Sequence, residues 1–80
     1  MQFLIVYHRS RQRLMELKSY PDEAAEEALS RKLELEFEFA SNKDVEVALF
    51  ESRDEATLRT THSRYFENAA NIAERLSKAG

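Results

Sequence analysis

A chain of 80 residues is long enough for one small domain and too short for a second hydrophobic core. It has no cysteine and a single glycine, which excludes disulfides, thiolate zinc sites and glycine-rich phosphate loops. Its net charge of −3 is uneven, because residues 21–51 are strongly acidic whereas residues 1–20 and 52–80 are mildly basic. The composition predicts one soluble domain over 1–80 with a small core, for which oligomerisation is the remaining source of added stability.

The N-terminal apolar run is short. Residues 3–7 are five apolar side chains with no basic segment before them. This is too few for the core of a signal peptide and far too few for a membrane span. Together with the absence of cysteine, which fits a reducing compartment, the run predicts an untargeted cytoplasmic protein.

Two strands are predicted at the start of the chain. Residues 2–8 form a nearly continuous apolar run, rich in β-branched and aromatic side chains, which is typical of a strand that is covered on both sides or central in its sheet. The polar residues 9–12 predict a hairpin loop. Residues 13–20 have weaker, mixed patterning and predict an edge strand.

The segment 21–40 has two interpretations. Pro21, Asp22 and Glu23 are typical of a helix start, but residues 33–39 alternate strictly, which taken alone indicates a strand. No turn signal separates the two patterns. Four apolar residues also recur at helical spacing: Leu29, Leu33, Phe37 and Ala40. We therefore predict one helix over about 21–40, with a helix followed by a hairpin strand as the alternative.

A second helical pattern occupies the C-terminal part. Ser52 and Glu55 have the spacing of a capping box, and apolar residues then recur every three or four positions. A straight helix over 54–79 would be about 39 Å long, which is long for so small a domain. The sequence leaves open whether 54–79 forms one helix or two, and residues 67–80 can be set apart as a C-terminal helical extension.

These elements define the predicted fold. Residues 45–50 predict a third strand, so the order is ββαβα with the last helix single or split. The helix between the second and third strands returns the chain to the opposite end, which makes those two strands parallel. The most apolar strand then fits between them. We predict an α+β fold, with a three-stranded antiparallel sheet of order 2-1-3 and two or three helices packed on one face.

Two basic segments are candidate anion-binding sites. Guanidinium groups on the hairpin loop can grip phosphate, and the segment 59–66 combines cationic side chains with hydroxyl groups. The candidate contacts to nucleic acid or another anion are Arg9, Arg11, Arg13, Arg59, His62 and Arg64. The competing interpretation, which the acidic net charge favours, is that these side chains are solvated or paired with the acidic middle segment.

No pattern in the sequence predicts catalysis, a metal or a cofactor. Ser63 follows His62, but neighbours on a helix point in different directions, so they do not predict a nucleophile and its base. A ladder of carboxylates runs through the middle of the chain: Glu34, Glu36, Glu38 and Glu46. A cation site needs oxygens that converge from a loop, so this ladder predicts a solvated acidic face. We expect no enzymatic activity.

A family resemblance is carried by the run V-E-V-A-L-F at 45–50 and the later run T-H-S-R-Y-F at 61–66. This pattern resembles small bacterial proteins of unknown function over residues 2–66. The resemblance implies a helix, rather than a hairpin, at 22–40. It implies no activity and no site.

Two function hypotheses follow. The first is a protein–protein interaction module, regulatory or adaptor-like, that forms a homodimer through the third strand, the C-terminal helix or both. Its predicted interface residues are Val45, Val47, Leu49, Tyr65, Phe66, Ile72 and Leu76. The alternative is a nucleic-acid-binding accessory protein that uses residues 8–13 and 59–64. Neither hypothesis involves a membrane.

Overall fold

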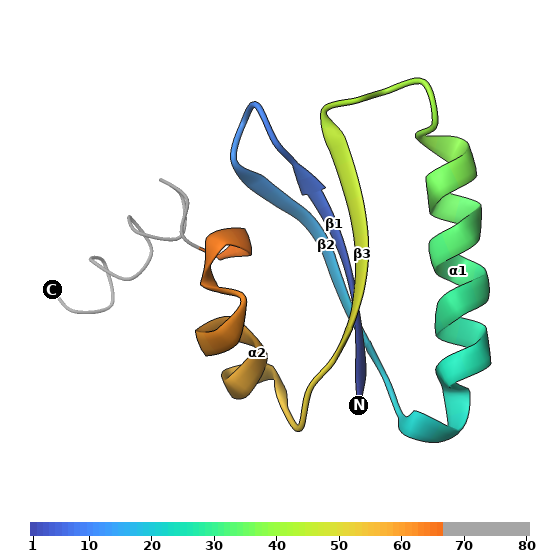
Figure 1. Ribbon diagram of the computed structural model, residues 1–80, viewed down its shortest axis with the longest axis vertical. Helices are drawn as coiled ribbons and strands as arrows, with labels where there is room; N and C mark the ends of the chain where they lie inside the picture. Colours follow the sequence, from blue (N-terminus) through green and yellow to red (C-terminus); the bar gives the residue numbers. More distant parts are fainter. Residues whose placement is uncertain (67–80) are drawn as a thin grey trace, which may run out of the picture.

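The structure is a computed structural model that describes residues 1–66 (Figure 1). Its elements are β1 (Gln2–His8), β2 (Arg13–Tyr20), the 3-10 turn η1 (Asp22–Ala24), α1 (Ala25–Glu38), β3 (Val45–Glu51), α2 (Glu55–Thr61) and the 3-10 turn η2 (Ser63–Tyr65). The three predicted strands and the helix in the middle of the chain are confirmed. The predicted extension at 67–80 lies outside the described residues.

The sheet is antiparallel, with strand order β2-β1-β3. This confirms the α+β class and the predicted 2-1-3 order. The most apolar strand takes the central place, and its residues Phe3–Tyr7 are all buried. A strand flanked on both sides satisfies its backbone within the sheet, so its side chains can be apolar on both faces.

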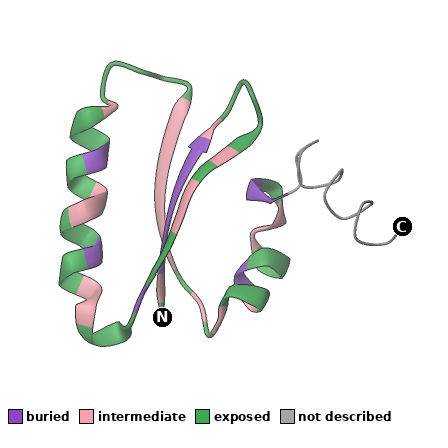
Figure 2. Cartoon of the chain, turned by 180° about the vertical axis from the view of Figure 1, so that it is seen from behind, coloured by how far each residue is buried: buried purple, intermediate pink, exposed green. Residues whose placement is uncertain are grey.

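The helices cover opposite faces of the sheet, as Figures 1 and 2 show. The core on the α2 face consists of Phe3, Ile5, Tyr7, Leu58, Tyr65 and Phe66. The core on the α1 face consists of Leu4, Val6, Tyr20, Ala28 and Leu35. The prediction that the helices share one face is therefore wrong. Successive side chains of a strand point to opposite faces, so a continuous apolar run needs cover on both.

The helix α1 turns only part of its apolar surface to the sheet. Ala28 and Leu35 are buried against the sheet. The residues that recur at helical spacing in the sequence lie elsewhere, since Leu29 is 48%, Leu33 56% and Phe37 86% exposed. The single helix is confirmed. It carries two apolar stripes, and the stripe that contains Ala28 and Leu35 is the one that is buried.

The helix α2 is short and begins one residue after Asp54. The Asp54 side chain accepts a hydrogen bond from the Thr57 N–H at 2.7 Å, so Asp54 is the N-cap in place of Ser52. The helix ends at Thr61, and η2 follows. Of the two alternatives left open for 54–79, a single straight helix is therefore excluded, because α2 is interrupted at His62. No helix in the region 1–66 has the length and apolar character needed to cross a membrane.

Candidate functional site

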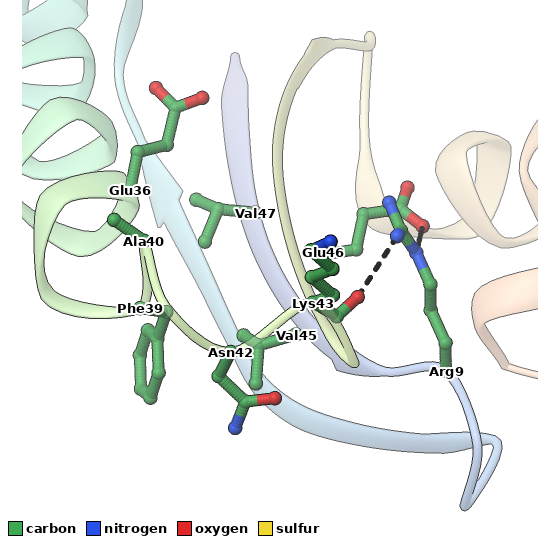
Figure 3. A pocket seen from close by; sticks show the side chains of 9 residues that line it. All are labelled: Arg9, Glu36, Phe39, Ala40, Asn42, Lys43, Val45, Glu46 and Val47. Carbon is green, nitrogen blue, oxygen red and sulfur yellow. Dashed lines mark hydrogen bonds and ion pairs between the residues drawn. The ribbon is translucent and has the colours of Figure 1, made fainter.

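Two distant basic segments meet at a single carboxylate, Glu46. Arg9 Nε donates to Glu46 Oε1 at 3.3 Å, and Arg64 Nη2 donates to Glu46 Oε2 at 2.6 Å. The Tyr65 hydroxyl donates a very short hydrogen bond to the same carboxylate. We call these four residues the Glu46 cluster. Figure 3 shows the Arg9 side chain reaching Glu46 and the Lys43 carbonyl, to which its Nη1 donates at 3.1 Å.

The topology of the sheet builds the Glu46 cluster. Glu46 alternates with Val45 and Val47, which face α1, so its carboxylate points to the α2 face. Arg9 follows β1 and is held beside β3 by its N–H, which donates to the Asp44 carbonyl at 2.7 Å. The Arg64 guanidinium lies over the ring of Tyr65, 4.1 Å from its centroid. Arg9 is therefore positioned by the loop after β1, while η2 positions both Arg64 and Tyr65.

The charges of the cluster stabilise one another. Burial opposes ionisation of Glu46, but hydrogen bonds from Tyr65, Arg64 and Arg9 outweigh it and lower the pKa of the carboxyl below its usual value of 4.5. The hydrogen bond to Glu46 raises the pKa of Arg64. Burial and the hydrogen bond to Glu46 raise the pKa of Tyr65 to about 12. At neutral pH the cluster thus holds one carboxylate, two guanidinium groups and a neutral phenol.

The other predicted anion contacts lie outside this cluster. Arg59 pairs with Glu55 within α2 at 3.0 Å. The His62 ring stacks on Phe50 with ring centroids 4.0 Å apart. Arg11 and Arg13 are exposed and line a separate hollow of about 300 Å³ with His8, Leu14 and Met15. The structure therefore brings together only two of the six candidates, and it does so around a carboxylate that the sequence did not single out as their partner.

Beside the cluster, Arg9 and Arg64 line an open hollow of about 370 Å³ together with Tyr7 and Gln12. An anion in this hollow would compete with Glu46 for both guanidinium groups. The Glu46 carboxylate offsets one of the two guanidinium charges, so the attraction of Arg9 and Arg64 for a phosphate is reduced. The nucleic-acid hypothesis stays a prediction, and this geometry weakens its electrostatic basis.

We expect the native protein to pass through a heparin column at about 50 mM salt, because its net charge is −3 and two of the candidate cations, Arg9 and Arg64, are paired with Glu46. Glu46→Gln, which frees Arg9 and Arg64, should increase retention. The salt concentration at which each protein elutes measures the retention of the native protein and of the variant. Firm retention of the native protein that is lost on replacing Arg11 and Arg13 by Ser would favour nucleic-acid binding instead.

A second candidate surface lies where α1 passes the outer edge of β3. It combines the exposed stripe Leu29, Leu33 and Phe37 with the backbone edge of β3, and we call it the α1–β3 surface. A hollow of about 410 Å³ opens next to this surface, between the C-terminal end of α1 and the start of β3 (Figure 3). Val47 on the α1 face of β3 and Glu46 on the α2 face both line it, so it lies at the outer edge of the strand. Exposed apolar area beside an open sheet edge is typical of an interaction site.

The backbone of β3 presents free hydrogen-bonding groups at this edge. Arg9 N bonds to Asp44 O at 2.7 Å and Ser52 N bonds to Met1 O at 2.9 Å, so hydrogen-bonded pairs stand at both ends of the β1–β3 ladder. Bonded and non-bonded pairs alternate in an antiparallel ladder. The backbone groups of Val47 therefore point away from β1, as do those of Leu49. Among residues 1–66, no strand lies beyond β3.

The two edges of the sheet differ in how well they are protected against pairing with a strand of another chain. The β1–β2 register shifts between Val6 and Tyr7, which marks a bulge in β2, and β2 also carries Arg13, Glu16 and Lys18. Bulges and charged side chains are typical devices that prevent edge-to-edge pairing. The β1–β3 register is regular over all seven pairs. The regular edge is therefore the one next to the apolar stripe.

The predicted interface residues have three outcomes. Val45, Val47 and Leu49 are partly buried, and their side chains pack beneath α1. Tyr65 and Phe66 are buried in the core on the α2 face, so their prediction as interface side chains is wrong. The η2 turn folds them back onto β1, where burial of their apolar rings stabilises the fold. The remaining two, Ile72 and Leu76, lie outside the described residues.

Neither a metal site nor a similar known protein adds a further candidate site in residues 1–66. Within the described part of the chain, no three His, Asp or Glu side chains gather closely enough to hold a metal ion. Comparison with known proteins gives no matching family model, no similar curated protein and no similar solved structure. The resemblance to small bacterial proteins stays a prediction.

Proposed function

We propose that this protein is a protein–protein interaction module that binds its partner through the α1–β3 surface. The observation that carries the proposal is the exposed stripe of α1, in which Leu29 and Leu33 lie toward the regular, open edge of β3 and Phe37 continues the stripe on the outer side of the helix. Residues 1–66 include eleven buried apolar side chains in two cores, yet Phe37 is 86% exposed. Retaining so large an exposed ring in a small domain is typical of a surface that is covered by a partner.

The hydrogen-bonding edge and the apolar stripe support the proposal in different ways. An extended segment that pairs with β3 gains backbone hydrogen bonds, and a neighbouring apolar stripe supplies the burial that drives association. The Glu46 cluster lies on the other face of β3 and pairs Arg9 and Arg64 with one carboxylate. Association through α1 and β3 therefore leaves the cluster intact.

The proposal predicts crosslinking at one position of the chain inside cells. A photoreactive phenylalanine analogue at Phe37, in the full chain expressed in its own host, should give a defined crosslinked adduct after illumination. The adduct is detected by gel mobility and identified by mass spectrometry. Position 37 suits the probe because its ring is exposed, so the folded domain is undisturbed.

The matched control places the same analogue at Met15. This side chain is also exposed, at 49%, but it belongs to the bulged, charged edge of the sheet. We expect no defined adduct there. Equal yields at both positions, or none at position 37, would contradict an interaction through the α1–β3 surface.

A further inference from the structure

We infer that the partner at the α1–β3 surface is a second copy of this chain, joined by antiparallel pairing of β3 with β3 about a two-fold axis. This inference rests on the proposed function and names its partner. The dimer would contain one continuous six-stranded sheet of order 2-1-3-3-1-2. The two α1 helices would lie side by side on one face of that sheet.

Two of the three residues of the apolar stripe flank the edge that would pair, whereas Phe37 projects about 180° from Ala28, away from the sheet. On a helix with 3.6 residues per turn, Glu36 projects about 80° from the sheet-facing direction of Ala28, and it lines the hollow at the outer edge of β3. Leu29 and Leu33 project about 100° and 140° in the same sense. They therefore lie on the flank of α1 that looks past β3, where the partner helix would come to rest.

The spacing of the elements allows the two helices to touch. The buried side of α1 packs on both β1 and β3, so α1 lies above the space between these strands. Strands are about 4.8 Å apart, and the two-fold axis would lie half a spacing outside β3. The two α1 axes would then be about 10 Å apart, which is within the range of packed helices. Strand pairing and helix packing are thus satisfied by the same arrangement.

The stripe is complementary to itself under this symmetry. The helix α1 runs antiparallel to β3 (Figure 1), and the two elements have similar lengths of about 21 and 23 Å. A two-fold axis at the middle of β3 therefore passes near Leu33. Leu33 would meet its own copy, while Leu29 of each chain would approach the end of α1 that carries Phe37 in the other.

The charges beside the stripe also match. Lys32 and Glu36 pair within one helix at 3.0 Å and lie on the sheet side of the stripe. Antiparallel helices would bring Lys32 of each chain near Glu36 of the other, so opposite charges alternate across the axis. On β3 itself, Glu46 is already neutralised by Arg9 and Arg64 and opposes no free carboxylate.

The test uses charge substitution at the axis, with the full chain and light scattering behind size exclusion. At tens of micromolar the native chain should have twice its 9.4 kDa monomer mass. Leu33→Glu and Leu33→Lys should each weaken the dimer by at least about tenfold, because like charges would meet at the axis. An equal mixture of the two variants should restore a dimer. Circular dichroism checks that both variants fold, which the exposure of Leu33 leads us to expect.

A covalent test fixes the geometry. The native chain has no cysteine, so Leu33→Cys should give a single disulfide-linked dimer on mild oxidation. The control is Glu27→Cys, an exposed position on the opposite flank of α1, which should stay monomeric. A dimer that ignores the charge at position 33, or that crosslinks equally at position 27, would overturn the pairing.

The outcomes separate this inference from the proposed function. A mass of 9.4 kDa at every concentration, combined with a position-37 adduct to a different protein in cells, would overturn self-association and leave the interaction module standing. A monomer that gives no adduct in cells would overturn both. Retention of the six-stranded dimer with no other adduct supports both.

Discussion

Replacing Val6 by Asp should abolish cooperative unfolding of the domain. Val6 is 3% exposed at the centre of β1, between β2 and β3, and its side chain lies in the core beneath α1. A carboxylate there would be buried without a partner, at a cost of several kcal/mol. A domain of this size has only about 4–12 kcal/mol of stability in total. A thermal melt followed by circular dichroism should therefore show a shallow, non-sigmoidal change.

The control for this change is Met15→Asp, which places the same charge on an exposed position of the neighbouring strand. We expect its melting curve to stay sigmoidal, with a change in stability within about 0.5 kcal/mol. A sigmoidal melt of the Val6→Asp variant near the native midpoint would mean that β1 is not the buried centre of the sheet.

The sheet could be predicted from the sequence because its signals are local. The apolar run at 2–8 identifies the central strand, and a helix between two strands restricts the possible orders to very few. The same apolar run also indicates that both faces of the sheet are covered, which the prediction of helices on one face did not take into account. Alternate residues such as Leu4 and Ile5 point to opposite faces and are both buried, so two covering layers are required.

The stripes of α1 show where pattern alone is insufficient. One apolar set at helical spacing contains Ala28 and Leu35, and another contains Leu33 and Phe37. Both satisfy the period of a helix, and only packing decides which set meets the sheet. The smaller Ala28 allows α1 to approach the sheet closely, which leaves the bulkier residues outside. The exposed stripe therefore became visible only in the structure.

The Glu46 cluster depends on tertiary contacts that no local signal reveals. Arg9 is 37 residues from Glu46 in the chain and Arg64 is 18. The sequence supplied the candidate cations and, separately, an acidic ladder that included Glu46. Strand alternation could have indicated that Glu46 faces away from Val45 and Val47. Which cations it meets there is decided by where the hairpin loop and η2 come to rest.

Glu46→Gln should lower the free energy of unfolding by about 1–2 kcal/mol at pH 7. The Glu46 side chain is 16% exposed, and its bond from the Tyr65 hydroxyl is charge-assisted, a type of bond that contributes about 1.5–3 kcal/mol. Glutamine keeps the shape and still accepts from the hydroxyl as a neutral group. Arg9 and Arg64 are more than half exposed and add little. Urea unfolding measures the difference, with Glu51→Gln, an exposed site in the same strand, as control.

The stability that is lost in the Glu46→Gln variant should also depend on pH, with a definite sign. Because the folded pKa of Glu46 lies below its usual value of 4.5, the unfolded chain binds the proton first as pH falls. The stabilisation by this carboxylate is therefore present above about pH 4.5 and is lost as pH falls through the lower, folded pKa. The stability difference between native and Glu46→Gln protein should accordingly shrink in that window. A double-mutant cycle with Tyr65→Phe should show coupling at pH 7 that fades on acidification. A difference that stays constant down to pH 3 would show that the carboxylate charge does not stabilise the fold.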